Sequence, residues 1–389
     1  MSVFVDPTAP LEHPLQWIAL AVGLVLVIST GAGLLQTLVL PRARRDRVAL
    51  YLERIVRALL MAVARLRPTY EGKDGILSLH GPLTLAAMLV AWLVFLLAGW
   101  GLVLWAVTTG TLSTSLREAG SSLFTLGFAS RDHWAPTVVD FLASASGLLV
   151  VALLIAYLPV LYAAFTRRET LVTMLQSRAG MPAWGPEILA RHQSVGLLRT
   201  LRAFYTDWER WTADVAESHT TYPILVTFRS PHALRSWITS LLAVLDAAAL
   251  QHALQGEEAP SQARLCLRMG FTALRDIADV LGIPYDPDPS PEDGIQLSYE
   301  SFLKGVERVA STGFPMIRTP EEAWPHFQGW RVNYESIAYA IADLITAPPA
   351  PWSGPRSNLR GVTIQPVVPI DRRPGEVVRG IPATDPSAQ

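Results

Sequence analysis

The chain has 389 residues, of which 50% are apolar and only 17% are charged, against about 25% charged residues in an ordinary soluble domain. A net charge of −1 gives no electrostatic basis for binding nucleic acid. Cys266 is the single cysteine and the histidines lack metal-ligand spacing, so the sequence predicts neither an internal disulfide nor a metal site.

Three segments without a charged residue predict membrane-spanning helices: 15–40, 83–107 and 141–165. Each run is about 25 residues long, and roughly 20 apolar residues are enough for a helix to cross a bilayer. The residues before the first run contain no Lys or Arg, unlike a signal peptide. We therefore expect residues 1–40 to form an extracellular N-terminus and a first transmembrane helix.

The distribution of arginine predicts the orientation in the membrane. Eight arginines lie in the linker after the first run and two more directly follow the third, whereas the 108–140 loop has only two, offset by acidic residues. Because arginine-rich loops stay in the cytoplasm, we expect a multi-pass cell-membrane protein with a cytoplasmic C-terminus. The N-terminus and the 108–140 loop then lie outside.

Residues 41–80 are predicted to form an interfacial helix and linker. Apolar residues recur at three- and four-residue spacing from Val48 to Val63, and arginines fall on the opposite face. This pattern is typical of an amphipathic helix at the membrane surface, with its basic groups near anionic headgroups. A solvated connector is the alternative. The arginines predicted to contact membrane lipid are Arg47, Arg54 and Arg57.

The loop at 108–140 has the pattern of a re-entrant segment. Residues 114–124 begin with hydroxyl-bearing caps and predict a short helix, and an extended stretch at 125–129 follows it. Non-helical backbone at membrane depth is tolerated only where protein or a water-filled pore surrounds it. Backbone carbonyls from several copies of such a loop can replace the hydration shell of an ion.

Residues 81–167 resemble the two-transmembrane pore module of the potassium channel family, in which a pore helix and a Thr-Val-Gly-Tyr-Gly filter lie between two membrane helices. Thr125, Leu126, Gly127 and Phe128 match the first four filter positions, with Leu for Val and Phe for Tyr. Ala129 takes the place of the second filter glycine. The resemblance implies a passive channel for a monovalent cation, with potassium favoured. A coincidental loop in a membrane protein that is not a channel is the alternative.

The departure at residue 129 has a predicted cost. Glycine adopts positive φ without strain and alanine resists it, so Ala129 must either adopt that conformation or displace the filter strand. We therefore expect weaker discrimination of potassium from sodium than a full filter gives. On the next membrane helix, the resemblance implies a gating hinge at Gly147, and Pro159 can kink the same helix further along.

Residues 168–346 read as a mostly helical cytoplasmic domain. The apolar spacing from Leu198 to Val215 fits either a core helix, which we favour, or a coiled-coil seam. A strand is predicted at 222–228, and a helix from the Ser-Pro pair at Ser230. Three further helices are predicted at 261–281, 298–312 and 320–346.

The C-terminal segment 347–389 contains nine prolines and few large apolar residues, a composition that predicts disorder. No dinucleotide fingerprint, Walker loop or nucleophile–base set appears in the chain. We therefore expect no cofactor and no enzymatic activity, and the ligand of the cytoplasmic domain stays unassigned.

Together these patterns predict an all-α membrane protein with three transmembrane helices, a re-entrant pore helix with a filter loop, and a helical cytoplasmic domain. One loop per chain cannot surround an ion, and no internal repeat is present. A channel must then be a homotetramer. The rival hypothesis is a membrane-anchored signalling or scaffold protein that acts through its cytoplasmic domain.

The predicted orientation can be tested by cysteine labelling in intact cells. A cysteine at position 45 should resist an impermeant thiol reagent, because the arginine-rich linker is expected inside. A cysteine at position 131 should react. External labelling at position 45 would contradict both the orientation and the pore interpretation.

Overall fold

A computed structural model describes residues 14–38, 47–130, 133–359 and 364. The described chain is helical throughout, and none of it forms a β-strand. It divides into two compact units. The first unit comprises residues 1–170, 209–233 and 268–288, and the second comprises 171–208, 234–267 and 289–389. The predicted extracellular N-terminus, the linker arginines before Arg47, and Arg131 lie outside the described residues.

Several helical segments are long and apolar enough to cross a membrane, and they fall into two groups. Pro14–Leu38, Tyr70–Val107 and Trp134–Ala179 match the predicted spans, and only 28%, 44% and 22% of their most apolar windows are buried. In Trp237–Glu258, 94% of the window is buried. Its apolar character is therefore accounted for by the core of the second unit, whereas the other three leave apolar surface for lipid or for other subunits.

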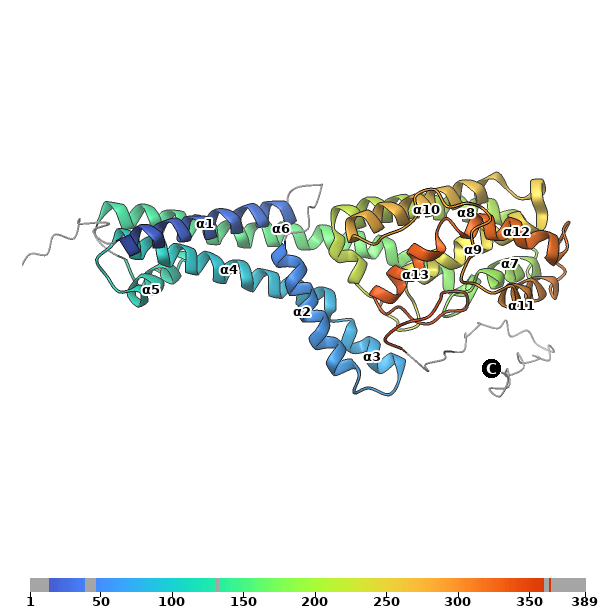
Figure 1. Ribbon diagram of the computed structural model, residues 1–389, viewed down its shortest axis with the longest axis horizontal. Helices are drawn as coiled ribbons and strands as arrows, with labels where there is room; N and C mark the ends of the chain where they lie inside the picture. Colours follow the sequence, from blue (N-terminus) through green and yellow to red (C-terminus); the bar gives the residue numbers. More distant parts are fainter. Residues whose placement is uncertain (1–13, 39–46, 131–132, 360–363, 365–389) are drawn as a thin grey trace, which may run out of the picture. The chain divides into compact units, whose positions relative to one another are not determined.

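In the first unit, α1 (Pro14–Leu38) and α4 (His80–Val107) lie side by side, as Figure 1 shows. Their backbones come close where Gly23 faces Gly99, because a Cβ on Gly23 would lie 2.7 Å from the Gly99 carbonyl oxygen. Small residues allow such close approach between membrane helices. The first part of α6 (Trp134–Ala179) shares a buried apolar cluster with both helices.

The linker helix α2 (Arg47–Ala64) is amphipathic as predicted, and its apolar face is partly covered and partly exposed. On one side, Leu60 packs with Leu77 of α3 (Tyr70–Leu77) in a small buried cluster. This part of the apolar face is covered by protein, and the interfacial position of the helix stays a prediction. Another row at four-residue spacing stays exposed: Tyr51, Ile55, Leu59 and Val63.

The second unit is built around α9 (Trp237–Gln255). Every residue of this helix except His252 is buried, which explains why its composition resembles that of a membrane span. The surrounding helices are α7 (Gly185–Ser194), α11 (Tyr299–Ala310), α12 (Pro320–Arg331) and α13 (Glu335–Leu344).

Three long helices are shared between the units: α6, α8 (Leu201–Thr221) and α10 (Ser261–Leu281). Short 3-10 turns occur at η1 (Leu198–Thr200), η2 (Pro223–Thr227) and η3 (Gly256–Glu258). On α8, the periodic residues Leu201, Tyr205 and Val215 are fully buried within the single chain. The core-helix interpretation of this segment is therefore confirmed over the coiled-coil alternative.

A buried arginine holds the second unit together. Arg331 is fully buried, and its guanidinium forms ion pairs with Asp246 and Glu335. It also donates to the Tyr339 hydroxyl at 2.8 Å and to the Trp352 carbonyl at 2.6 Å. These partners come from α9, α13 and the chain beyond α13, so one side chain links three parts of the unit.

Some predicted elements differ from those observed. The segment 222–228 forms the 3-10 helix η2 instead of a strand, because no described strand is present for it to pair with. The helix predicted from Ser230 begins at Trp237, where the core-facing apolar run starts. The predicted helix 320–346 breaks after Arg331, and this turn brings Arg331 and Tyr334 together on Asp246.

Other predictions hold. The helix at 261–281 is confirmed as α10, and Gly282 after it has the left-handed φ of +69° expected of a helix-ending glycine. The prediction of disorder from residue 347 is wrong as far as Leu359. This stretch is packed, because Trp352 and Arg356 are buried in the second unit. Residues 365–389 lie outside the described chain.

Replacing Arg331 should destabilise the second unit strongly. Arg331→Met leaves the carboxylates of Asp246 and Glu335 buried without their cation, which typically costs about 3–5 kcal/mol. Denaturant unfolding of the full chain in detergent micelles measures the loss. Lys304→Met is the matched control, because the Lys304–Glu300 pair is exposed. Equal midpoints for the two variants would show that Arg331 does not hold the unit.

Candidate functional site

The predicted short helix in the 108–140 loop is present as α5 (Leu112–Leu123). Thr111 caps its start by accepting a hydrogen bond from the Thr114 backbone N–H at 3.3 Å. The helix lies close against α4, where a Cβ on Gly101 would meet the Leu116 side chain at 2.5 Å. Glycine at position 101 therefore brings α5 against the membrane helix that precedes it.

The C-terminus of α5 ends in a Schellman motif. The Thr125 N–H donates to the Ser122 carbonyl at 3.0 Å, and the Leu126 N–H donates to the Ser121 carbonyl at 2.8 Å. Thr125 adopts the left-handed φ of 55° that this motif requires, although glycine is the usual residue there. The loop that follows is thereby set at a defined angle to α5.

Ser121 holds the amide groups of the following loop. Its carbonyl accepts from the N–H of Gly127 at 3.4 Å as well as from Leu126, and its side-chain oxygen accepts from the N–H of Ala129 at 3.0 Å. In a trans peptide the N–H and the preceding C=O point in opposite directions. The carbonyls of Thr125, Leu126 and Phe128 therefore point away from Ser121.

The predicted filter residues occupy an exposed loop. The Leu126 and Phe128 side chains are 63% and 55% exposed, and the Arg117 guanidinium lies 5.4 Å from the centre of the Phe128 ring. Gly127 has a φ of +70°, a conformation that suits glycine. Ala129 does not adopt positive φ. Ala129 therefore does not adopt the first of the two predicted conformations, and the effect of alanine on a filter stays a prediction.

Three residues on one face of α6 fix the end of α5. The Ser122 hydroxyl donates to the Asp140 carboxylate at 2.6 Å, and the Ser144 hydroxyl donates to the Ser122 carbonyl at 2.7 Å. One turn further along, a Cβ on Gly147 would lie only 2.0 Å from the Leu123 carbonyl oxygen. Sequence reasoning missed this role for Asp140 and Ser144, which stand two turns and one turn before Gly147.

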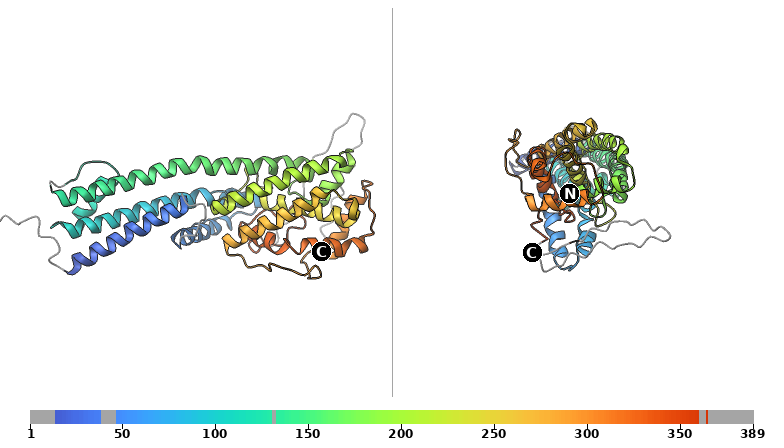
Figure 2. Two further views of the ribbon diagram at one scale, coloured as in Figure 1. Left: turned by 90° about the horizontal axis from the view of Figure 1, so that it is seen from above. Right: turned by 90° about the vertical axis from the view of Figure 1, so that its right-hand side faces the viewer.

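The two predicted hinge residues both lie within α6. Figure 2 shows this helix, coloured teal to green, as one unbroken ribbon. Gly147 is required by its close contact with α5, which is a packing reason for glycine distinct from the predicted hinge. Pro159 lies inside the helix and is exposed. A role of either residue in gating stays a prediction.

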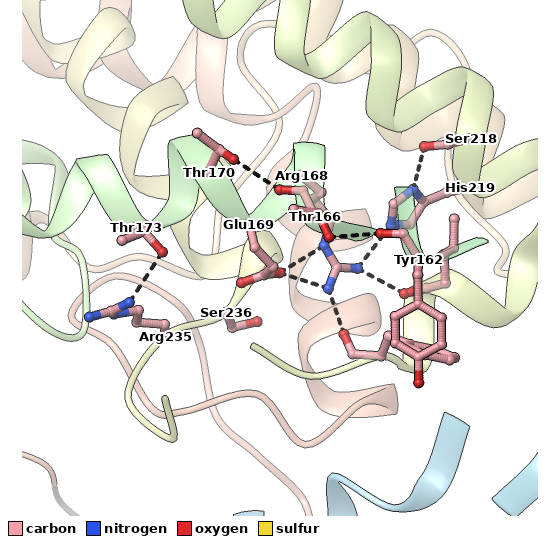
Figure 3. Close-up of polar contacts among 12 residues, drawn as sticks. Tyr162, Thr166, Arg168, Glu169, Thr170, Thr173, Ser218, His219, Arg235 and Ser236 are labelled. Atoms are coloured by element: carbon pink, nitrogen blue, oxygen red, sulfur yellow. Dashed lines mark hydrogen bonds and ion pairs between the residues drawn. The ribbon is translucent and has the colours of Figure 1, made fainter. Parts of the chain in front are cut away.

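Near the end of the apolar part of α6, Arg168 is fully buried in a network of polar contacts (Figure 3). Two of its nitrogens donate to the Glu169 carboxylate at 2.9 and 2.8 Å. It also donates to the main-chain carbonyls of Leu225 at 2.8 Å and Phe228 at 2.7 Å. A charge this deeply buried requires such full pairing.

His219 completes the network around Arg168. Its Nε2 lies 3.1 Å from a guanidinium nitrogen of Arg168, and its Nδ1 lies 3.1 Å from the Ser218 hydroxyl. Arginine only donates hydrogen bonds, so Nε2 is the acceptor and the ring is neutral with its proton on Nδ1. Burial, together with the Arg168 charge, holds the pKa of His219 well below its ordinary value.

Residues 222–229 link the start of α4 to the end of the apolar part of α6, and we call them the clamp segment. Phe228 packs against Phe165 with ring centres 5.9 Å apart, and a Cβ on Gly81 of α4 would meet its ring at 2.5 Å. The next residue, Arg229, pairs with Asp74 of α3. The clamp segment therefore contacts α3, α4 and α6 within the first unit.

The arginines predicted to contact lipid have different surroundings. Arg54 is exposed and Arg57 is half-buried, and both lie on α2. The side chain of Arg47 lies outside the described part of the chain. Among the described residues, no group of three His, Cys, Asp or Glu side chains is placed to hold a metal ion.

No known protein family, curated protein or solved structure matches this chain.

The His219 contact predicts sensitivity to acid. The folded chain keeps this histidine neutral, whereas the unfolded chain titrates near 6.5. Stability is therefore fully present above about pH 6.5 and falls below it, by up to about 1.4 kcal/mol per pH unit. His219→Gln keeps an acceptor for Arg168 but cannot be protonated, so thermal unfolding of the full chain in micelles should depend less on pH.

His232→Gln serves as the control, because His232 is exposed in the same unit. This variant should keep the pH dependence of the wild type. If the wild type and His219→Gln lost stability equally steeply as the pH falls, protonation of His219 would not be the cause of that loss.

Proposed function

We propose that this protein is a homotetrameric cation channel in the cell membrane, with potassium as its permeant ion. The observation that carries the proposal is the orientation of the loop after α5. Ser121 binds the loop amides, so the carbonyls of Thr125, Leu126 and Phe128 point away from this buried residue. In an ion filter, backbone carbonyls from several subunits face one axis and replace the hydration shell of the permeant cation.

The setting of the loop supports the same proposal. α5 lies between two membrane-length helices, α4 and α6, and its C-terminal end leads into the loop. A helix C-terminus carries partial negative charge, which favours a cation nearby. The positive Arg117 guanidinium is held over the Phe128 ring, so it neutralises part of that field.

Four copies are needed because one loop supplies only one side of an ion site. On α6, Phe141, Leu148 and Ile155 are exposed at seven-residue spacing, which places them on one face of the helix. The opposite face packs against α4. We assign the exposed face to contacts with neighbouring subunits and with the pore.

In this proposal α1, α4 and α6 cross the bilayer, and α9 stays in the core of the cytoplasmic second unit. The exposed row of α2 that begins at Tyr51 then rests in the inner interface, with Arg54 beside it. The clamp segment packs against the cytoplasmic start of α4. Through Arg168 it is also bound to α6, at the cytoplasmic end of the apolar part of that helix. Movement of α6 at a gate must therefore involve the clamp segment.

Recording from purified protein in planar bilayers, with potassium and sodium on opposite sides, tests the proposal. Gly127→Val should abolish conductance while the tetramer persists, because valine resists the φ of +70° and distorts the carbonyl row. Gly196→Val is the matched control. Gly196 has the same φ and equally open surroundings, but it follows α7 in the second unit.

Unchanged ion flux in Gly127→Val would rule out the filter assignment, and so would equal loss of flux in Gly196→Val. The rival proposal, a membrane-anchored signalling or scaffold protein acting through its second unit, predicts no conductance in the wild type and requires no four-fold assembly. Cross-linking or mass measurement of the purified complex separates the two proposals without any recording.

A further inference from the structure

A cavity of about 410 Å³ lies in the second unit. Its volume falls in the range of about 300–1,000 Å³ that is usual for small-molecule sites. The described residues that line it come from the end of α9, the η3 turn, the start of α10, and α12 with the loop before it. The residues that bear on its chemistry are His252, Glu257, Arg264, Arg318, His326 and Trp330.

Positive charge dominates the lining. Two arginines face one glutamate among the lining residues that the structure describes. Ser261, the first residue of α10, also lines the cavity, and the start of a helix carries partial positive charge. Two histidines, His252 and His326, each add a ring N–H donor in the neutral form. The cavity therefore favours an anion over a neutral or cationic ligand.

The Arg318 guanidinium is held in place before any ligand arrives. Its Nη1 donates to the carbonyls of His252 at 3.2 Å and Ala253 at 3.0 Å, at the end of α9. Gly256 leaves room for it, because a Cβ there would lie 3.1 Å from Nη2. Arginine carries five N–H donors, so those on Nη2 stay available to a ligand. A fixed arginine fork suits phosphate oxygens.

The opposite wall is aromatic and also ordered. The Arg264 guanidinium lies 5.7 Å from the centre of the Trp330 ring, and the His252 ring lies 5.9 Å from it. The Nε2 atom of His252 is buried without a hydrogen-bond partner among the described residues. A buried polar atom of this kind gains when a ligand supplies its partner.

We propose that this cavity binds a phosphate-bearing small molecule, with Arg264, Arg318 and His252 contacting its phosphate oxygens. The proposal does not depend on channel activity, and its test needs none. Full-length protein in detergent micelles is titrated calorimetrically with sodium pyrophosphate, with ionic strength held constant by chloride. Saturable binding is expected in the wild type.

Arg264→Gln should weaken pyrophosphate binding about tenfold or more, because it removes a charge-assisted contact. Arg268→Gln should leave the affinity unchanged, since Arg268 is exposed one turn further along α10 and does not line the cavity. Arg318 is unsuitable for this test because it also supports the end of α9. A parallel titration with ATP distinguishes a site for bare phosphate groups, with equal affinities, from one that also uses an organic group, with tighter ATP binding.

Absence of saturable pyrophosphate binding in the wild type would overturn the proposal. Equal affinity of Arg264→Gln and wild type would overturn it as well, as would an equal loss in Arg264→Gln and Arg268→Gln, which would indicate a general charge effect. Thermal unfolding of each variant without ligand confirms that the second unit is folded in every titration.

Discussion

The arrangement of the loop after α5 depends on the contact between the end of α5 and Gly147. With a Cβ only 2.0 Å from the Leu123 carbonyl, any other residue would push the two helices apart. That shift would also separate Ser144 from the Ser122 carbonyl and Asp140 from the Ser122 hydroxyl. These bonds set the angle of the Schellman motif, and the motif sets where the loop carbonyls point. A single glycine on α6 thus controls backbone geometry on another element.

The other end of the membrane part of α6 is fixed by charge. Arg168 has no solvent to stabilise it, so its carboxylate partner Glu169 and the carbonyls of the clamp segment must do so. The buried charge of Arg168 therefore requires the carbonyls of the clamp segment as hydrogen-bond acceptors. His219 contributes only in its neutral form, which couples the network to pH. Close packing and hydrogen bonds therefore hold the first part of α6, around Gly147, and a buried ion pair holds it at Arg168.

The sequence predicted the membrane-length helices and α5 well, because apolar runs and hydroxyl caps are local signals. It could not predict the clamp segment. Residues 222–228 have strand-like composition, but their path is decided by long-range bonds to Arg168. The same limit applies to the packed stretch ending at Leu359, where proline content predicted disorder and the buried Trp352 carbonyl accepts from Arg331. The composition of a segment does not show which distant side chain will form hydrogen bonds with its main chain.

The loop at 125–129 adopts positive φ at other residues than the sequence predicted. The sequence places the expected strain at Ala129, whereas the backbone places left-handed φ at Thr125, which ends α5, and at Gly127. A non-glycine residue in that conformation costs roughly 1–2 kcal/mol, and the bonds to Ser121 and Ser122 offset this cost. Ala129 avoids the strain because its N–H turns back to the Ser121 side chain. Alanine at position 129 is therefore accommodated without positive φ, and the left-handed conformations of the loop fall on Thr125 and Gly127.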